Sequence, residues 1–301
     1  MKTRAISVFN TLLMLALITF WGGSFVVVKI AINEGLKPIA IATFRFLIAG
    51  GLFLLVLLFK KSTKRNYKLL VERKDYPTLL LLALSGVTFF FIAQYTGIQM
   101  AGASIAAILV CLLSPILITV LSVKILKEHL TEKHILGIAI AAIGTFNVII
   151  GGTLSVSSGR EFFLGSLILL ATPILWTTYS IFGKKIMEKY NPFIVVVYVT
   201  MLGGLCLIPF SLAEDSLCQI FAISYIGWMA ILFLSFACSL LGYYIWFRVL
   251  KEVGAATTSS FLFAEPLITV MFAVIFVGEK LTPLILVGGL LLFIGVYIVS
   301  T

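Results

Sequence analysis

The sequence predicts an all-α integral membrane protein with ten transmembrane helices, arranged as two inverted five-helix repeats. Three observations lead to this prediction: the apolar composition, a series of long apolar stretches, and a motif that recurs in the second half of the chain. Hydrophobic residues make up 61% of the 301 positions and charged residues only 11%. Such a composition leaves too little polar surface for a water-soluble globular protein.

The apolar stretches have the length that a bilayer requires, since a hydrocarbon core about 30 Å thick is crossed by roughly 20 residues of helix. The first stretch follows a short basic segment, MKTR, but it is too long for a signal peptide and lacks a small-residue cleavage site. The ten predicted spans are Thr11 to Ala31, Pro38 to Phe59, Pro77 to Ile98, Ala103 to Val123, Ile135 to Gly151, Phe162 to Gly183, Pro192 to Ala213, Ile223 to Phe247, Ala255 to Val277 and Thr282 to Ser300.

Basic residues are distributed unequally between the predicted loops, which indicates topology rather than a nucleic-acid partner. With a cytoplasmic N-terminus, seventeen Lys and Arg residues face the cytoplasm and only three, Lys37, Arg160 and Lys280, face outwards. Because cytoplasmic loops are enriched in Lys and Arg, we expect both termini in the cytoplasm of a prokaryotic cell, with the chain in the plasma membrane.

The fourth and fifth spans recur as the ninth and tenth. The segment beginning at Ser114, SPILITVLSVKILKEHLTEKHILG, aligns with the one beginning at Glu265, EPLITVMFAVIFVGEKLTPLILVG, at a constant offset of 151 residues. The offset pairs Pro115 with Pro266, Glu128 with Glu279, Thr131 with Thr282, Gly137 with Gly288 and Gly144 with Gly295. Earlier in each half, Trp21 pairs with Trp176 and Lys29 with Lys184 at an offset of 155.

The duplication predicts two units, residues 1–151 and 162–301, each of five helices. Because five is odd, the second unit enters the membrane with the opposite polarity. Proteins built from such inverted repeats place their substrate site near the midplane, between the two units.

The sequence also resembles a known family. WGGSFVVVK, PIAIATFRFLIAG, the SPI and EPL prolines, and the KEHLT and GEKLT turns are similar to the EamA branch of the drug/metabolite transporter (DMT) superfamily. This resemblance covers nearly the whole chain. It implies a secondary carrier of small metabolites that works by alternating access, most simply an exporter of amino acids or related compounds. The alternative is an exchanger of nucleotide sugars, sugar phosphates or nucleosides. One departure is that Val199 stands where the first repeat has Arg45.

Two ionisable residues lie deep in the predicted spans. Glu265 is ten residues into its helix and Arg45 is seven, so their depths differ by only about 5 Å. A charge at membrane depth costs at least about 2.5 kcal/mol, and it nearly always faces a cavity or a partner. We expect both to face a central cavity, with Arg45 holding a substrate carboxylate and Glu265 a substrate amine or a coupling proton. The alternative is a buried structural ion pair between them.

Other predicted substrate-binding residues lie at similar depth, and two prolines are predicted to kink their helices by removing a backbone donor. The polar and aromatic candidates are Trp21, Ser24, Gln94, Trp176, Tyr179, Tyr198 and Tyr243, and the kink prolines are Pro115 and Pro266. Trp246, near a cytoplasmic helix end, is expected to be an interface anchor. Cys111 is expected to be a small apolar filler.

Enzymatic chemistry is not expected. His129 and His134, the two histidines, fall in a predicted cytoplasmic turn, and no two carboxylates are embedded together. The sequence therefore predicts no catalytic residue, no cofactor and no metal. Its expected partners are a small-molecule substrate and the lipid bilayer, with protons as a candidate coupling ion.

Overall fold

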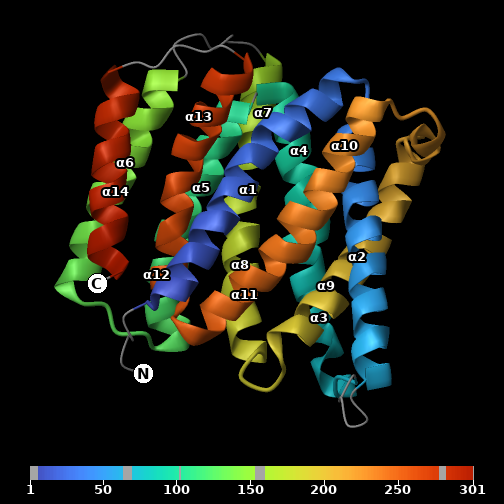
Figure 1. Cartoon of the computed structure of the whole chain (residues 1–301), viewed down its shortest axis with the longest axis horizontal. Coiled ribbons are helices and arrows are strands. Elements are labelled where there is room, and N and C mark those ends of the chain that lie inside the picture. Colours follow the sequence, from blue (N-terminus) through green and yellow to red (C-terminus); the bar gives the residue numbers. More distant parts are fainter. Residues whose placement is uncertain (1–5, 64–69, 102, 153–159, 278–282, 301) are drawn as a thin grey trace.

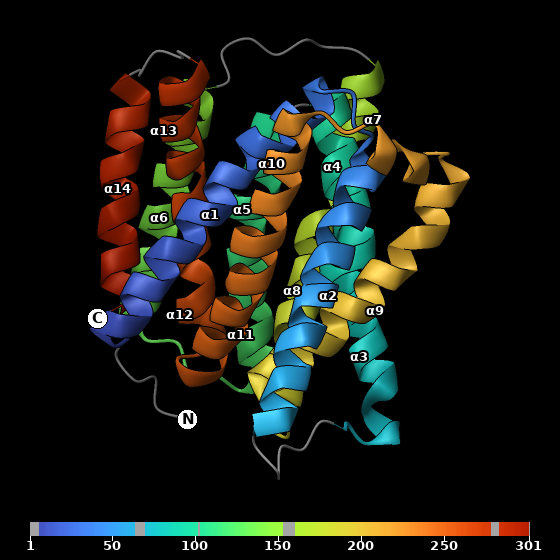
Figure 2. The same ribbon diagram turned by 45° about the vertical axis from the view of Figure 1, so that its right-hand side comes forward.

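The computed structural model describes residues 6–63, 70–101, 103–152, 160–277 and 283–300, and all regular structure in these ranges is helical. The helices run along the height of the molecule, as Figure 1 shows. Figure 2 gives the same bundle turned by 45°. In the first half the helices are α1 (Val8–Asn33), α2 (Pro38–Thr63), α3 (Tyr76–Ala83), α4 (Phe89–Ala101), α5 (Ala103–Leu121) and α6 (Glu132–Gly152).

The second half repeats this alternation of helices and short connections. Its helices are α7 (Arg160–Leu169), α8 (Ala171–Ile186), α9 (Pro192–Ala213), α10 (Tyr225–Phe233), α11 (Gly242–Glu252), α12 (Ala255–Ser260), α13 (Glu265–Val277) and α14 (Pro283–Ser300). Each stretch predicted from the sequence is helical where the structure describes it, except for a turn at Leu170 and for Ile223 and Ser224, which precede α10. Within the described residues, seven helices are long and apolar enough to cross a membrane.

Several helices join end to end through short turns of different pitch, which the sequence did not reveal. The π-helical segments η2 (Leu84–Thr88) and η5 (Leu234–Leu241) connect α3 to α4 and α10 to α11. A third π segment, η3 (Ser122–Leu126), ends α5, and a 3-10 turn, η6 (Phe261–Ala264), joins α12 to α13. Such segments leave backbone carbonyls outside the regular α-helical pattern and often occur at functional sites.

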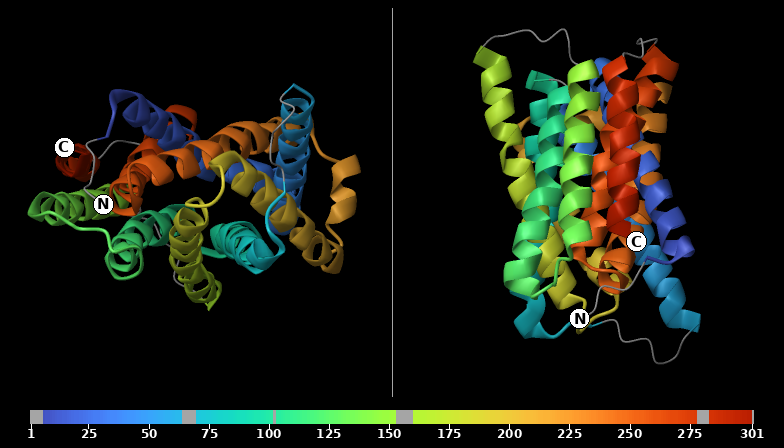
Figure 3. Two further views of the ribbon diagram at one scale, coloured as in Figure 1. Left: turned by 90° about the horizontal axis from the view of Figure 1, so that it is seen from below. Right: turned by 90° about the vertical axis from the view of Figure 1, so that its left-hand side faces the viewer.

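Helices from the two halves pack against each other throughout the bundle. α1 contacts α13, α2 contacts α9, and α5 contacts α8. α6 and α14 form a pair at one edge, seen at the left of Figure 1. The beginning of α1 and the end of α14 lie at the same end of the bundle, which Figure 3 shows from below and from the side.

Glycines allow α6 and α14 to approach closely. A Cβ atom added to Gly295 would lie 2.5 Å from the backbone nitrogen of Ala141, and one added to Gly137 would lie 2.7 Å from the carbonyl oxygen of Gly295. Small residues at facing positions are the usual means by which membrane helices bring their backbones into contact. The pair is therefore fixed by backbone proximity rather than by large side chains.

We predict that Gly295→Ala destabilises the protein by about 1–3 kcal/mol, because the added methyl group must push α14 away from α6. Gly51→Ala is the matched control, since a Cβ atom at Gly51 in α2 would have no neighbour within 4 Å. Thermal unfolding of the purified protein in detergent measures the difference. Equal melting temperatures for the two variants would contradict the close contact.

Candidate functional site

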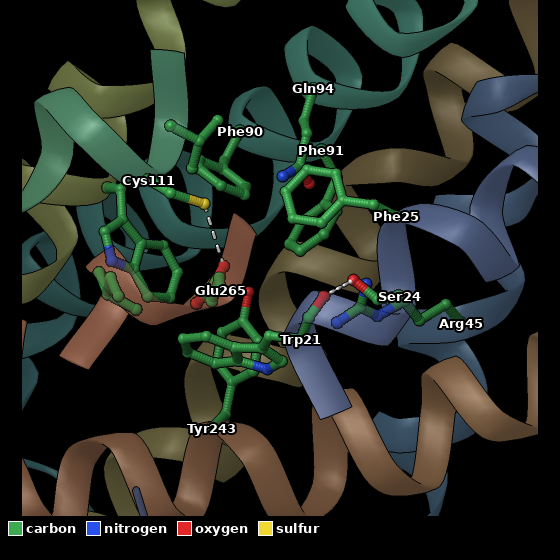
Figure 4. Close-up of a pocket in the computed structure, with 13 residues that line it drawn as sticks. Trp21, Ser24, Phe25, Arg45, Phe90, Phe91, Gln94, Cys111, Tyr243 and Glu265 are labelled. Atoms are coloured by element: carbon green, nitrogen blue, oxygen red, sulfur yellow. Dashed lines mark hydrogen bonds between the residues drawn. The ribbon is translucent and has the colours of Figure 1, made fainter. Parts of the chain in front are cut away.

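A cavity lies inside the bundle, with an empty volume of about 460 Å³ including its mouth. Figure 4 shows its lining, which comes from both halves of the chain. The lining residues are Trp21, Ser24, Phe25, Arg45, Phe90, Phe91, Gln94, Val110, Cys111, Trp176, Tyr243, Leu262 and Glu265. Seven of the predicted substrate-binding residues are therefore brought together: Trp21, Ser24, Arg45, Gln94, Trp176, Tyr243 and Glu265.

Glu265 is the first residue of α13, and its side chain is only 4% exposed. The thiol of Cys111 donates a hydrogen bond to its Oε2 atom at 3.3 Å. Its other oxygen, Oε1, has no hydrogen-bond partner among the described residues. The expectation that Cys111 is only an apolar filler is wrong, because its thiol is hydrogen-bonded to the carboxyl group and both residues line the cavity.

The position of Glu265 is fixed by contact between α13 and α1. The hydroxyl of Thr269 donates to the carbonyl oxygens of both Glu265, at 3.0 Å, and Gly22, at 2.9 Å. A Cβ atom at Gly22 would lie 2.8 Å from the Cβ of Ile268 and 2.9 Å from the carbonyl oxygen of Glu265. The glycine in α1 thus lets α13 come close enough to bring the carboxyl group to the cavity.

Arg45 enters the cavity from α2 and is 2% exposed. Its Nε atom donates to the hydroxyl of Ser239 at 2.7 Å, and its Nη1 atom donates to the hydroxyl of Tyr95 at 2.6 Å. The guanidinium carbon lies 4.5 Å from the ring centroid of Phe91 and 5.0 Å from that of Phe46. These contacts hold the cation through neutral hydroxyls and aromatic faces.

Arg45 and Glu265 are not bonded to each other. None of the ion pairs found in the described part of the chain includes either residue. The buried structural pair that the sequence allowed is therefore not formed in this structure, although both side chains line the same cavity.

The aromatic wall is held by the π-helical segments. The indole nitrogen of Trp21 donates to the carbonyl oxygen of Cys238 in η5 at 2.9 Å. The hydroxyl of Tyr243 donates to the carbonyl oxygen of Gly86 in η2 at 2.8 Å. The rings of Trp21 and Trp176 meet edge to face with centroids 5.3 Å apart. Each π segment thus supplies an acceptor that orients one ring of the cavity.

The other predicted residues have different places. Ser24 lines the cavity and donates to the carbonyl oxygen of Trp21 at 2.6 Å. Tyr179 lies behind the lining, buried, with its ring 5.0 Å from that of Trp176. Tyr198 is half-buried on α9, with its ring 6.2 Å from that of Tyr76, and it is not part of the cavity lining.

The kink prolines lie next to lining residues. We call a rod any run of helical segments that join end to end, such as α12, η6 and α13. Pro266 is the second residue of α13 and comes just after the 3-10 turn η6, so this rod changes pitch beside Glu265. Pro115 lies inside α5. Each proline removes the backbone donor for the carbonyl four residues earlier, and those carbonyls belong to Leu262 and Cys111, which both line the cavity.

Sequence reasoning missed the apolar part of the lining: Phe25, Phe90, Phe91, Val110 and Leu262. In sequence these residues look like lipid-facing ones. The spacing of Phe90 and Gln94, one helical turn apart, is the one pattern that could have placed a phenylalanine on the lining face.

The expectation that Trp246 anchors its helix at the membrane interface is wrong. Its ring is fully buried, 5.7 Å from that of Trp21 and 5.4 Å from that of Trp176.

Comparison with known proteins identifies the family. The profile of the EamA-like transporter family matches residues 9–150 and again residues 163–301. The chain belongs to the EamA-like transporter family. The resemblance seen in the WGGSFVVVK, SPI and EPL segments is confirmed.

Relatives of this EamA protein are transporters by name. An uncharacterized transporter of Archaeoglobus fulgidus is 31% identical, with 94% of this chain and 95% of the relative covered. A probable amino-acid metabolite efflux pump of Salmonella typhimurium is 27% identical, with 95% and 93% covered. A solved crystal structure has a TM-score of 0.75 at 17% identity, with 96% of each chain covered, and this likeness concerns the fold alone. The chain is a multi-pass membrane transporter of the DMT type.

We predict that Tyr95→Phe destabilises this EamA protein by about 1.5–3 kcal/mol, because Nη1 of buried Arg45 loses its acceptor. Tyr244→Phe is the matched control: Tyr244 is half-buried beside Phe193, with ring centroids 6.1 Å apart, and contributes no bond to Arg45. Thermal unfolding in detergent is the measurement. If Tyr95→Phe melted no earlier than Tyr244→Phe, the hydrogen bond would not be what holds the guanidinium.

Proposed function

We propose that the protein is a secondary transporter that exports amino acids or closely related zwitterionic metabolites by alternating access to the central cavity. The observation that carries the proposal is that Arg45 and Glu265 line one cavity without being paired to each other. A cation and a carboxyl group that face the same space match the two charged ends of a zwitterion.

Each group has binding capacity left for a ligand. Arg45 uses Nε and Nη1 in its hydrogen bonds to Ser239 and Tyr95, and a guanidinium carries five N–H donors, so donors remain for a substrate carboxylate. Glu265 accepts from Cys111 through Oε2, and Oε1 is available for an amine or a coupling proton. The ligand amine would satisfy an oxygen that is buried and has no hydrogen-bond partner among the described residues.

The remaining lining would contact the apolar part of the substrate. Trp21, Trp176 and Tyr243 offer ring faces and edges, and Ser24 and Gln94 offer polar groups beside them. Tyr179 would support Trp176 from behind rather than contact the ligand. Tyr198 is left out of the proposed contact set because it lies outside the lining.

Ten crossings in two inverted units, residues 1–151 and 162–301, form the architecture that we propose for this cycle. The contacts between helices support it, because the main ones have counterparts under exchange of the halves. α2 and α9, the second predicted spans of their halves, contact each other, and so do α6 and α14, the fifth spans. The contact of α1 with α13, between a first and a fourth span, corresponds to that of α8 with α5. The π segments η2 and η5 both lie in the third rod of their half.

The excess of basic residues in one set of loops supports a topology with both termini in the cytoplasm of a prokaryotic cell. In that orientation α1 begins and α14 ends at the cytoplasmic face. The changes of pitch at η6 and beside Pro266, with Pro115 in the matching helix, are the points at which we propose that the rods bend during the cycle.

Phosphorylated sugars and nucleotides fit the cavity less well. They carry two or more negative charges, and Arg45 is the single cation among the described lining residues. Glu265, which lines the same cavity, would repel a second phosphate charge. A zwitterion is therefore the better match to the charges present.

We predict that Glu265→Gln and Arg45→Ala each reduce counterflow of the transported amino acid in proteoliposomes by at least about tenfold, since each removes one charged contact of about 1.4 kcal/mol or more. An imposed pH gradient separates the two roles proposed for Glu265. Loss of the pH response in Glu265→Gln identifies it as the coupling site, and an unchanged response restricts it to binding the amine.

Glu188→Gln and Arg160→Ala are the controls, because both residues are exposed and lie outside the cavity lining. All variants are compared at equal amounts of monodisperse protein. Full transport by both Glu265→Gln and Arg45→Ala would show that the two charges do not act in transport. Counterflow with phosphorylated sugars but with no amino acid would favour the alternative substrate class.

A further inference from the structure

Three segments that are distant in sequence meet at the end of the bundle where α1 begins. Glu128 lies in the connection between η3 and α6, Lys184 in the last turn of α8, and Ala255 at the start of α12, near the bottom of Figure 1. Lys184 forms an ion pair with Oε1 of Glu128. The backbone N–H groups of Ala255 and Ala256 donate to the same carboxylate at 2.9 and 3.2 Å.

Glu128 acts as the cap of a helix to which it does not belong. The N-cap residue of α12, Gly254, provides no side-chain hydrogen bond, and its φ of +129° is one that favours glycine. A Cβ atom at Gly254 would lie 3.3 Å from Oε1 of Glu128 and 3.4 Å from Nζ of Lys184. The absence of a side chain there leaves room for the carboxylate and the ammonium group.

The pair is shielded from water and charged. The side chains of Lys184 and Glu128 are 14% and 12% exposed. Burial raises the pKa of Glu128, but the charge of Lys184 and the donated hydrogen bonds outweigh burial, so the pKa lies below its ordinary value. At neutral pH the carboxylate is therefore ionised and bonded on both sides, which is the condition for a partly buried pair to hold segments together.

The three segments belong to rods that line the cavity. Glu128 follows α5 and η3, the rod that carries Cys111. Lys184 lies in the last turn of α8, two turns beyond Trp176. Ala255 begins the rod that continues through η6 to Leu262 and Glu265. A bond between these ends therefore fixes how far apart the cavity walls stand at this end of the bundle.

Aromatic rings fill the space along α8 between the cavity and Lys184. The ring of Tyr179 stacks on that of Phe247 with centroids 4.8 Å apart, and Trp176 packs against Trp246 at 5.4 Å. A Cβ atom at Gly183 would lie 2.7 Å from the ring of Phe247. The cavity is thus closed towards Lys184 by packed rings, and the polar contact lies beyond them.

We propose that Glu128, Lys184 and the first amides of α12 form a latch that holds this end of the transport cavity shut, and that the latch opens in the opposite state of the cycle. This inference rests on the proposed function, because it assigns the latch to an alternating-access cycle. Glu128 comes from the first half of the chain and its partners from the second, so relative movement of the halves breaks these bonds. Removing the latch shifts the population towards the state that is open at this end.

Access to the cavity from each face tests the latch without a transported substrate. A reporter, Ser24→Cys, is introduced at the cavity lining in the full chain, with the native cysteines Cys111, Cys206, Cys218 and Cys238 replaced by serine. A membrane-impermeant thiol reagent is then applied to vesicles of either orientation. The latch variants are Glu128→Gln and Lys184→Met, and the exposed Glu188→Gln is the control.

We predict that each latch variant raises labelling from the face that carries Glu128 by about fivefold and lowers labelling from the other face. The double variant should differ little from either single variant, because both changes remove the same ion pair between Glu128 and Lys184. Two results overturn the proposal: unchanged labelling in both variants, or an equal rise from both faces, which indicates general loosening. If the wild type transported no amino acid, the proposed function would fail, but the labelling asymmetry would still be measured.

Discussion

A charged side chain inside a membrane protein is costly unless neighbouring groups replace its lost hydration. Two such side chains, Arg45 and Glu265, line one cavity of this protein. Ser239, Tyr95 and two phenylalanine rings surround Arg45, while the carboxyl group of Glu265 accepts a hydrogen bond from the thiol of Cys111. The guanidinium is therefore well supported on its protein side, and the carboxyl group retains an oxygen without a partner among the described residues.

The two halves of the chain contribute unequally to this arrangement. Arg45 comes from the first half, where the second has Val199, and Glu265 comes from the second half, where the first has Ser114. A duplicated architecture with identical halves would place like charges at equivalent positions, and these would repel each other in a small cavity. Divergence of the halves gives opposite charges instead. A ligand that bridges them also bridges the two units whose relative movement we propose for transport.

Much of the architecture was readable from the sequence because membrane helices follow from hydropathy and length. The stretches from Pro192 to Ala213 and from Ala255 to Val277 were predicted with the bounds that the helical rods have, and the isolated charges of Arg45 and Glu265 marked the cavity. The family was also readable, since the SPI and EPL segments repeat at a fixed offset.

The apolar lining and the changes of helical pitch could not be predicted. Apart from the one-turn spacing between Phe90 and Gln94, Phe90 and Phe91 share their sequence properties with phenylalanines that face lipid, and packing decides which side they face. The π segments η2 and η5 supply carbonyls to Tyr243 and Trp21 across the bundle, contacts between residues far apart in the chain. Cys111 was misjudged for the same reason, because its role depends on Glu265, which lies 154 positions away in the chain. Such long-range contacts leave no local pattern.

The most direct test of the central claim is competition against amino-acid counterflow by analogues that lack one charge. Wild-type protein should reject both the amide, which lacks the carboxylate, and the N-acetyl derivative, which lacks the amine. Arg45→Ala should lose its discrimination against the amide, and Glu265→Gln its discrimination against the N-acetyl compound, so that each variant fails at one end of the substrate. Equal competition by the unmodified amino acid, its amide and its N-acetyl derivative in the wild type would contradict the account, because the two buried charges would then not recognise the two ends of a zwitterion.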